Sequence, residues 1–417
     1  MNVELITIGD ELLLGLTIDS NAAWLARELG AIGIAVPWRT TVGDKAEDIA
    51  AAVRLALDRS GGAITTGGLG PTADDLTKPA IAQLFGRGMH FDEQLWEGLR
   101  KLWRERGRPG ELPEANKQQV MIPDGATILP NRHGTAPGIW LEDARGRWVA
   151  MLPGIPREMR GLANDEVLPR LRARAGHVNA TIQSIAVRTT AIAESQLPAL
   201  LGEYAEEIDG MRVSYQPSPS GVDLRLTISG VAREEGAQRL RKAADELRAR
   251  IGVNVYGADE QDLAAIMLDA CRARGWRIAV AESCTGGLLG ERLTRIPGAS
   301  DVFLGGVIAY DNRVKETMLG VSASELSKHG AVSEHVARAM AAGARSATGA
   351  EIGLAITGVA GPDGGTPEKP VGTVWVAVDT PIGQKTYGGR LIGDRAEVRY
   401  RATQSVLDLL RRLISGP

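Results

Sequence analysis

A serine stands where a predicted strand gives way to a predicted helix, in the run AESCTGG at residues 281–287. The apolar run before it, Trp276–Val280, predicts a buried strand, and the apolar spacing of Leu288–Ile296 predicts a helix. At such a turn the Ser283 hydroxyl is held out from the sheet edge as a nucleophile, and unpaired N–H groups at the helix start can stabilise an oxyanion. The two glycines let a substrate approach that backbone closely. The simpler alternative is that Ser283 or Thr285 only caps the helix.

Two further stretches follow or adjoin predicted strand ends and should lie beside this turn. They are Ala309–Lys315 (AYDNRVK) and Ile356–Pro362 (ITGVAGP). The first offers Lys315 as a base and Tyr310 as a phenol, and no histidine lies near these segments in the sequence, so a Ser-His-Asp arrangement is not expected. A partly buried lysine can lose its proton near neutral pH and activate a hydroxyl, although an exposed helix lysine is the plain alternative. Cys284 is a second candidate nucleophile, but strand–turn alternation predicts that it points away from the serine.

A second candidate site lies in TTGGLGPTADDLT, residues 65–77, at the end of the predicted strand Gly62–Thr66. Its glycines allow backbone N–H groups to face a phosphate. Asp74 and Asp75 could hold a divalent metal, because Mg²⁺ takes few protein carboxylates together with phosphate oxygens. Alternatively, these acidic residues only favour a helix start. Three other stretches strengthen the candidate: GDELLLG (9–15), NRHGTAPG (131–138) and LPGIPREM (152–159).

The composition is that of an ordinary globular protein. The 417 residues are 44% hydrophobic and 24% charged, with a formal net charge of −3, and this length predicts two or three domains. The net charge gives no hint of the basic face that a dedicated nucleic-acid binder needs. No apolar run approaches the roughly 18 residues of a membrane span. The two cysteines, Cys271 and Cys284, fit a reducing compartment, so we expect a cytoplasmic protein without a membrane partner.

The elements that must position these residues follow an α/β rhythm. Strand and helix alternate from Val3 to about Leu171 and again from Asp262 onward, which predicts parallel sheets with ligand sites beyond the carboxyl ends of their strands. Between His177 and Tyr256, strands with period-2 patterning accompany two helices, which predicts a small α+β domain. The expected domains are 1–171, 172–258 and 259–417.

The carboxyl-terminal motifs carry a family resemblance. Residues 262–415 contain AESCTGG, GGVIAYDNRVK, LAITGVAGPDGGTPEKPVGTVW and GDRAEVR in this order. They closely resemble the carboxyl-terminal domain of the CinA (competence/damage-inducible protein A) family, which is the nicotinamide mononucleotide (NMN) deamidase domain. The resemblance implies hydrolysis of NMN to nicotinate mononucleotide and ammonia, with no cofactor or metal in this domain. It implies that Ser283 attacks the amide carbon, that Lys315 removes the serine proton, and that Tyr310 positions the nucleophile or relays that proton.

The same resemblance implies a set of substrate contacts, with backbone N–H groups of residues 285–287 holding the oxyanion. The implied contacts are Cys284, Thr285, Gly286, Gly287, Thr357, Gly358, Arg395 and Arg399. The two arginines suit the 5′-phosphate, because a guanidinium matches phosphate geometry with two hydrogen bonds. The alternative for these arginines is surface charge on a helix.

The amino-terminal stretches, from Met1 to about Leu171, resemble the molybdopterin-binding (MoaB/MogA-like) fold in its CinA branch. The resemblance implies hydrolysis of ADP-ribose to AMP and ribose 5-phosphate with a divalent metal (Mg²⁺, Mn²⁺ or Co²⁺). The implied metal-binding or water-activating carboxylates are Asp10, Glu11, Asp74 and Asp75, the last two also counted as catalytic. The implied nucleotide or phosphate contacts are Gly67, Gly68, Gly70, Pro71, Thr72, Lys117, Asn131, Gly134 and Thr135, with Glu158 orienting the site. Molybdopterin is the rival ligand, because better-known members of this fold handle it.

The middle segment resembles the KH-type connector of full-length CinA proteins. It contains no GXXG, the loop with which KH domains clamp nucleic acid, so we expect a spacer or dimerisation element rather than an RNA-binding one. Together these resemblances imply a homodimeric enzyme of pyridine-nucleotide salvage that takes NMN and ADP-ribose. Two alternatives stay open: a non-catalytic partner in competence or DNA-damage responses, and a deamidase whose amino-terminal domain binds nucleotide or molybdopterin as a regulator.

Overall fold

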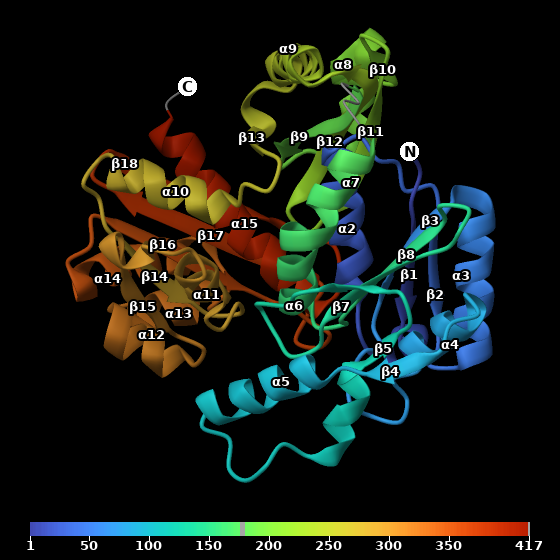
Figure 1. The fold of residues 1–417 in the computed structure, drawn as a ribbon. Coiled ribbons are helices and arrows are strands. Elements are labelled where there is room, and N and C mark those ends of the chain that lie inside the picture. Colours follow the sequence, from blue (N-terminus) through green and yellow to red (C-terminus); the bar gives the residue numbers. More distant parts are fainter. Residues whose placement is uncertain (176–179, 416–417) are drawn as a thin grey trace. The chain divides into compact units, whose positions relative to one another are not determined.

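The computed structural model describes residues 1–175 and 180–415. His177, the predicted start of the middle segment, lies outside the described residues. By its internal contacts the chain divides into two compact units (Figure 1). The first unit contains Met1–Gln183 and Ile228–Ala237, and the second contains Ser184–Thr227 and Gln238–Pro417. Among the described helices, none is long and apolar enough to cross a membrane.

The first unit is built on a six-stranded sheet in the order β2-β1-β3-β8-β7-β6. The strands are β1 (Glu4–Ile8), β2 (Arg39–Val42), β3 (Gly62–Thr66), β6 (Thr127–Leu129), β7 (Gly138–Glu142) and β8 (Trp148–Leu152). The first four in this order are parallel, and β7 and β6 continue the sheet antiparallel. The sequence pattern predicts the second strand at Ala35–Thr40, but Ala35 forms only an isolated bridge with Asn2, and the strand begins at Arg39.

Helices cover both faces of this sheet. They are α1 (Asp10–Leu13), α2 (Ser20–Ala31), α3 (Ala46–Ser60), α4 (Thr77–Leu84), α6 (Pro156–Leu162), η2 (Ala163–Val167) and α7 (Leu168–Ala175). Side chains alternate across a strand, so Leu5 of β1 packs in the core with α2, α6 and α7, while its neighbour Ile6 packs in the core with α3 and α4. Because helices cover both faces, ligands are expected to bind beyond the carboxyl ends of the parallel strands.

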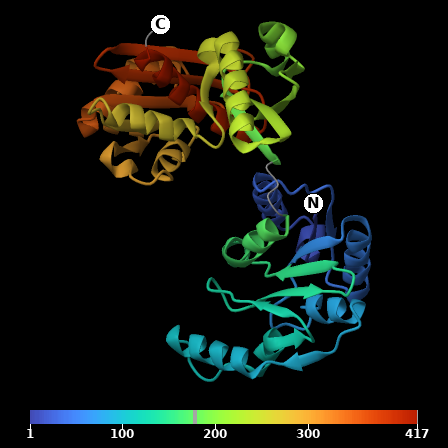
Figure 2. The ribbon, with the colours of Figure 1, turned by 45° about the horizontal axis from the view of Figure 1, so that its top comes forward.

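A small extension of this unit carries its own apolar cluster. It consists of β4 (Met89–Phe91), α5 (Glu93–Glu105), η1 (Glu114–Val120) and β5 (Met121–Pro123), with β4 and β5 paired antiparallel. Helix α5, drawn in cyan, stands apart from the six-stranded sheet in both views (Figures 1 and 2). Leu99 packs there with Leu112 and Val120.

The middle segment forms a five-stranded sheet in the order β10-β11-β12-β9-β13. Its strands are β9 (Ala180–Thr189), β10 (Glu207–Ile208), β11 (Met211–Ser218), β12 (Gly221–Ala232) and β13 (Val255–Ala258). The helices are η3 (Glu194–Gln196), α8 (Leu197–Leu201), η4 (Gly202–Tyr204), α9 (Arg233–Ile251) and η5 (Gly252–Asn254). The sequence pattern predicts one helix over Glu194–Tyr204, whereas the structure has three short helical segments there. The break between α8 and η4 falls at Gly202, which adopts a positive φ of 59°.

The carboxyl-terminal sheet has the order β15-β14-β16-β17-β18. The strands are β14 (Ile278–Glu282), β15 (Phe303–Ile308), β16 (Ile352–Gly358), β17 (Thr373–Thr380) and β18 (Gly383–Arg390). The helices are α10 (Leu263–Arg272), α11 (Leu288–Thr294), η6 (Ala299–Asp301), α12 (Asn312–Leu319), α13 (Ala323–His329), α14 (Glu334–Thr348) and α15 (Arg395–Ile414). Ile278 and Val280 of β14 face the core with α10, α11 and α15, and Ala279 and Ala281 face the core with α13 and α14. Three parallel strands therefore end together, with Glu282 beside Ile308 and Ile356.

Candidate functional site

The AESCTGG turn leaves β14 at the sheet edge and is held by its own strand neighbours. The Ser283 N–H donates to the Ile356 carbonyl of β16 over 2.9 Å, and the Gly286 N–H donates to the Ser283 carbonyl over 3.1 Å. Gly286 and Gly287 have positive φ values of 58° and 96°, a backbone shape that residues with a Cβ adopt at a cost. Ser283 is 9% exposed and is thus nearly buried.

Glu282, to which sequence reasoning assigned no role, organises the start of α11. Its side chain is 1% exposed, and its carboxylate accepts hydrogen bonds from the N–H groups of Gly287, Leu289 and Gly290 at 2.8–3.1 Å. A buried carboxylate is stable here because it meets the positive end of a helix and satisfies donors that have no helical partner. The signal in the sequence was an acidic residue, Glu282, at the end of an otherwise apolar strand and just before the turn that leads into a helix.

This arrangement narrows the predicted oxyanion donors. The N–H groups of Gly286 and Gly287 already donate to Ser283 and Glu282. The Thr285 N–H has no acceptor among the described residues, and the fully buried Thr285 hydroxyl has none either. A buried donor without a partner is rare in folded proteins, so among the three predicted oxyanion donors, residues 285–287, Thr285 is the one with a free N–H.

Cys284 is buried within the apolar core. Burial raises the pKa of its thiol to about 11, and the charge of Glu282 also raises it, against the opposite effect of Arg399 and Arg395. The thiolate is the nucleophilic form of cysteine. A thiol with this pKa stays protonated near neutral pH, which favours Ser283 over Cys284 as the nucleophile.

Lys315 lies on α12, which follows β15, the parallel neighbour of β14, at the same end of the sheet as Ser283. The Ala309 N–H donates to the Glu282 carbonyl over 2.7 Å, and the Lys315 ammonium donates to the Ala309 carbonyl, also over 2.7 Å. Lys315 is 1% exposed, and burial lowers its pKa, while the charge of Asp311 opposes that shift. One main-chain residue, Ala309, thus connects the amine to the strand end that carries Ser283.

Two arginines of α15 hold loops around the turn. The Arg399 guanidinium donates from Nε and Nη2 to the Thr285 carbonyl, at 3.2 and 2.6 Å. Arg395 donates from Nη1 to the Gly361 carbonyl and from Nη2 to the Tyr310 hydroxyl, at 2.5 and 3.3 Å. Tyr310 is 63% exposed, so its hydroxyl lies at the rim of the site.

A cavity of about 590 Å³ opens beside these arginines. Its walls are formed by residues 360–362, Val371, residues 393–396 and Arg399. Thr357 and Gly358, predicted to contact substrate, end β16 next to it: the Thr357 hydroxyl is buried and donates to the Ala331 carbonyl, and a Cβ on Gly358 would strike the Thr373 carbonyl oxygen. Neither residue is among those that line the cavity, so substrate contact by Thr357 and Gly358 stays a prediction.

The amino-terminal glycine loop borders a second cavity, of about 440 Å³, at the carboxyl ends of β1, β3 and β8. The residues predicted for this site that line the cavity are Gly67, Gly68, Gly70, Pro71, Glu11, Asp74, Asp75, Thr135 and Glu158, and Asp44 and Gln119 line it as well. Gly67 and Gly68 have φ values of 106° and 65°. A Cβ on Gly67 would strike the Ile8 carbonyl oxygen, so glycine is needed for the loop to cross the end of β1.

Asp44 was missed by sequence reasoning and joins the acidic side of this cavity. Its carboxylate accepts from the Asp10 N–H over 2.9 Å, and the Asp10 carboxylate accepts from the Asp44 N–H over 3.2 Å. Burial raises the Asp44 pKa, and the charges of Asp10, Glu11 and Asp74 raise it further. Within the described residues, however, no group of three or more His, Cys, Asp or Glu side chains is placed to hold a metal ion by itself.

The other predicted residues of this site have structural partners. Asp75 accepts from the N–H groups of Gly70 and Thr72 and from the Thr72 hydroxyl, at 2.5–2.8 Å, so it fixes the glycine loop. Lys117 pairs with Glu114 on the surface of η1 and does not line the cavity. Asn131 donates to the Glu158 carboxylate over 3.1 Å.

Gly134 and Lys78 do not line this cavity but lie against residues that do. A Cβ on Gly134 would strike the Glu158 carboxylate, so this glycine gives the carboxylate its place. Lys78, which sequence reasoning did not select, is 1% exposed and donates to the carbonyls of Gln118 and Gln119 at 2.6 and 2.9 Å. Burial lowers the Lys78 pKa to about 8, and the charge of Asp75 opposes that shift.

Comparison with known proteins decides the family. A CinA-like protein of Gemmatimonas aurantiaca is 57% identical over 413 residues, covering 99% of this chain and 96% of that protein. The chain belongs to the CinA family. A second CinA-like protein, from Frankia casuarinae, is 42% identical over 425 residues, covering 100% of this chain and 97% of that protein.

Three family models match successive parts of this CinA-family chain. They are the probable molybdopterin binding domain at residues 4–173, the damage-inducible protein CinA KH domain at 184–257 and the CinA C-terminal domain at 260–414. The predicted architecture, a MoaB-like α/β domain, a KH-like middle domain and a CinA C-terminal domain, is confirmed.

Solved structures resemble parts of the chain. The competence/damage inducible protein CihA from Agrobacterium tumefaciens is 38% identical, covering 36% of this chain and 93% of that one, with a TM-score of 0.36. The protein CinA with unknown function from Thermoplasma acidophilum is 32% identical, covering 41% of this chain and 97% of that one, with a TM-score of 0.37.

Proposed function

We propose that the CinA C-terminal domain of this chain hydrolyses the carboxamide of NMN to nicotinate mononucleotide and ammonia. One observation carries the proposal: a serine at a strand-end turn and a buried lysine with a lowered pKa share one sheet edge, joined through Ala309. Serine and lysine suffice for amide hydrolysis when the lysine can be neutral and oxyanion donors are present.

The chemistry follows from the groups at that edge. The Ser283 oxygen attacks the amide carbon while neutral Lys315 accepts the hydroxyl proton. The negative charge that develops on the amide oxygen is met by the unpartnered Thr285 N–H. Lys315 then returns the proton to the departing ammonia, which leaves a nicotinoyl ester on Ser283. Water, deprotonated by Lys315, hydrolyses this ester and restores the serine.

Recognition of the mononucleotide would fall to the cavity beside α15. Arg395 keeps guanidinium N–H groups available beyond its two contacts, and it lines the cavity with the start of α15, where a helix favours an anion. Arg399 also lines this cavity, but its main contact is with the Thr285 carbonyl. We infer that Arg395 meets the 5′-phosphate and that Arg399 chiefly positions the turn.

Ammonia release from NMN by the purified full chain tests the proposal. A Ser283→Ala variant should lose at least about 10³-fold in kcat, because the covalent step has no nucleophile. A Cys284→Ala variant should lose less than about tenfold, because a protonated thiol takes no part in the chemistry. Equal ammonia release by wild-type protein and Ser283→Ala would refute the nucleophile, and no release by the wild type would refute the activity.

We propose hydrolysis of ADP-ribose to AMP and ribose 5-phosphate as the function of the amino-terminal domain. The supporting observation is a cavity with a glycine loop on one side and the carboxylates of Glu11, Asp44 and Asp74 on another. The negative charges of nearby carboxylates raise the pKa of Asp44, and a bound cation would offset this repulsion between like charges. These residues fit Mg²⁺, Mn²⁺ or Co²⁺, because such ions take one or two carboxylates and complete their shell with water and phosphate oxygens.

A bound divalent metal would supply charge neutralisation for the pyrophosphate and a more acidic water. The chain itself contributes the Gly67–Gly70 backbone as a phosphate cradle, and Glu158, which lines the same cavity, would hydrogen-bond to the nucleotide. AMP release should fall at least about 10²-fold in EDTA and in an Asp74→Asn variant. An Asp92→Asn variant, which alters only the cap of α5, is the matched control. Undiminished AMP release in EDTA contradicts the metal requirement.

A further inference from the structure

A cavity of about 470 Å³ lies where the KH-like and CinA C-terminal domains meet. The KH-like side contributes residues 190–192 and 219–221, and the other side contributes Tyr387, Leu391 and one face of α15 from Arg401 to Arg412. It does not share a lining residue with the cavity beside Arg395. Its volume is in the range of small-molecule sites, about 300–1,000 Å³, and such sites favour domain interfaces.

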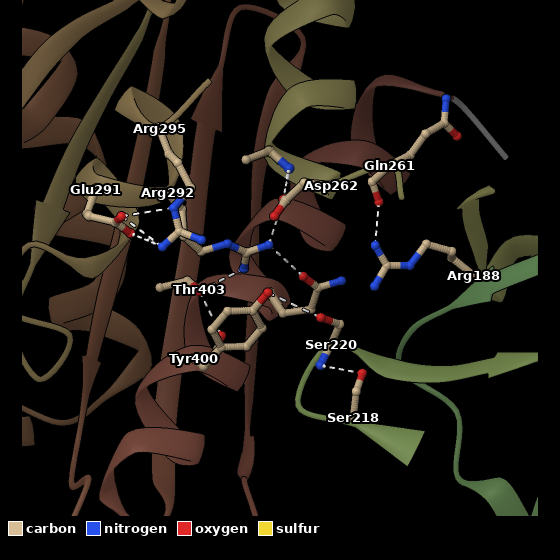
Figure 3. Close-up of polar contacts among 12 residues, drawn as sticks. Arg188, Ser218, Ser220, Gln261, Asp262, Glu291, Arg292, Arg295, Tyr400 and Thr403 are labelled. Atoms are coloured by element: carbon tan, nitrogen blue, oxygen red, sulfur yellow. Dashed lines mark hydrogen bonds and ion pairs between the residues drawn. The ribbon is translucent and has the colours of Figure 1, made fainter. Parts of the chain in front are cut away.

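Hydrogen bonds on both sides of the cavity fix its walls. The hydroxyls of Ser220 and Tyr400 lie 3.2 Å apart across the junction (Figure 3). Farther along α15, Arg412 donates to the Asn254 side chain over 2.8 Å, and Arg411 donates to the Val255 carbonyl over 3.1 Å. The space between these contacts is therefore a formed part of the junction.

Gln404 presents an unpaired donor in this cavity. Its side chain is 3% exposed, its Oε1 accepts from Arg292 Nη2 over 3.1 Å, and its Nε2 has no partner among the described residues. A guanidinium can only donate, so the oxygen of the amide must face Arg292 and the NH₂ must face away from it. Arg292 is itself fixed by Asp262 and Thr403 (Figure 3). Gln404 lines the cavity and Arg292 does not, and Nε2 is a buried atom, so the free NH₂ lies within the cavity wall and points away from Arg292.

Arg401 adds positive charge to the same wall. Its Nε is buried without a hydrogen-bond partner, and no ion pair of Arg401 occurs among residues 1–175 and 180–415. The one carboxylate of the lining, Asp408, is already shared by Arg411 and Arg412 at 2.6 and 2.7 Å. The cavity thus carries unpaired donors and a net positive charge, and the one carboxylate of its lining is already paired.

Other parts of the lining are apolar. Ile192, Leu391 and Leu409 line the cavity together with the Tyr387 ring. Ala191, at its rim, holds a positive φ of 54°, a strained shape for alanine that persists where the surroundings impose it. A molecule that fits needs an apolar or aromatic body and one anionic acceptor group directed at Gln404 and Arg401.

We propose that this junction cavity is a binding site for a small aromatic or aliphatic carboxylate. The carboxylate would accept from the Gln404 amide and the Arg401 guanidinium, and the body would pack on Ile192, Leu391 and Leu409. The site is separate from the proposed deamidation, so failure of one proposal leaves the other standing. A cavity filled only by water, which would satisfy Gln404 Nε2 equally well, is the competing account.

Calorimetric titration of the full chain with benzoate, 2-naphthoate and indole-3-acetate tests this site, with 2-naphthamide as the uncharged counterpart. At least one carboxylate should bind once per chain with a Kd of about 0.1–1 mM, and the amide should bind at least about fivefold more weakly. No saturable binding of any of the three acids up to about 10 mM would overturn the proposal in favour of a water-filled gap.

Two substitutions place the binding in this cavity. Gln404→Glu keeps the acceptor for Arg292 and the side-chain shape but replaces the free donor with a negative oxygen, so carboxylate affinity should fall at least about tenfold. Gln216→Glu is the matched control, because Gln216 also accepts from an arginine, Arg225, but lies on the exposed face of β11. An Arg401→Met variant should weaken the acid and leave the amide unchanged. Equal affinity in Gln404→Glu and Gln216→Glu would show that the acids bind elsewhere.

Discussion

Arg399 of α15 grips the main-chain carbonyl of Thr285 with two nitrogens of one guanidinium, at 3.2 and 2.6 Å. Thr285 is the second residue after Ser283 and carries the N–H without an acceptor. The carboxyl-terminal helix therefore fixes the Thr285 carbonyl, two residues after the candidate nucleophile. Arg399 and Thr285 are 114 positions apart in the sequence. Catalytic turns need such support, because small misplacements of reacting groups are costly.

Replacement of this arginine by lysine should impair turnover through geometry. Arg399→Lys keeps the positive charge but removes the planar fork that holds one carbonyl with two donors. We expect kcat for NMN to fall about tenfold, which corresponds to ~1.4 kcal/mol of transition-state stabilisation. Steady-state kinetics of ammonia release measure the effect, and Arg338→Lys, on the exposed side of α14 and paired with Glu334, serves as control. An unchanged kcat would mean that the fork does not position the turn.

The pH dependence of deamidation should report Lys315. Burial lowers its pKa from 10.5, and only the neutral amine can accept the serine proton. The activity, measured as kcat/KM, should therefore rise tenfold per pH unit on the acid side and level off below pH 10.5. Lys315→Arg keeps a cation that cannot lose its proton, so it should lose at least about 10³-fold, as should Lys315→Met. A rising limb that persists in either variant would assign that limb to another group.

The Ser283 turn could be predicted because its signals are local. An apolar run, a serine, two glycines and a helical pattern follow one another within a few residues, and β14 and α11 are found where they were expected. Strand β18 (Gly383–Arg390) was not foreseen, because its sequence GQKTYGGR is polar and rich in glycine and it forms the sheet edge. Strand β18 is held by backbone pairing with β17, and this pairing cannot be read from its side-chain pattern.

Contacts between distant segments could not be predicted in the same way. Asp44 lies 34 residues from Asp10, and the two meet only because β2 pairs with β1. Lys78 looked like an ordinary helix residue, and its burial depends on the η1 carbonyls 40 residues later. In both cases a charged side chain in the sequence carries no mark of its burial, since burial depends on tertiary packing.

Loss of the Glu282 charge should destabilise the carboxyl-terminal domain. Glu282→Gln keeps the shape, but its NH₂ faces N–H groups that the carboxylate now satisfies. Charge-assisted hydrogen bonds contribute roughly 1.5–3 kcal/mol each and a buried unmet donor costs about 1–3 kcal/mol, so we expect a loss of about 3 kcal/mol. Urea unfolding measures it. Glu291→Gln, which removes only an exposed pair with Arg295, should change stability by less than about 0.5 kcal/mol. Similar losses in both variants would contradict the capping role.

Lys78 should make the stability of the amino-terminal unit depend on pH in the alkaline range. Burial lowers its pKa from the ordinary lysine value of 10.5 to about 8 in the folded chain. Between these values the unfolded chain binds more protons, so the free energy of unfolding should rise with pH, by about 3 kcal/mol across the window. Lys78→Met should remove this rise and, because the carbonyls of Gln118 and Gln119 lose their donor, lower stability throughout. Lys101→Met, at a 72% exposed side chain, is the control. Urea unfolding of each variant below pH 8 and near pH 10.5 decides: an equal rise in Lys78→Met and wild-type protein would assign the dependence to other groups.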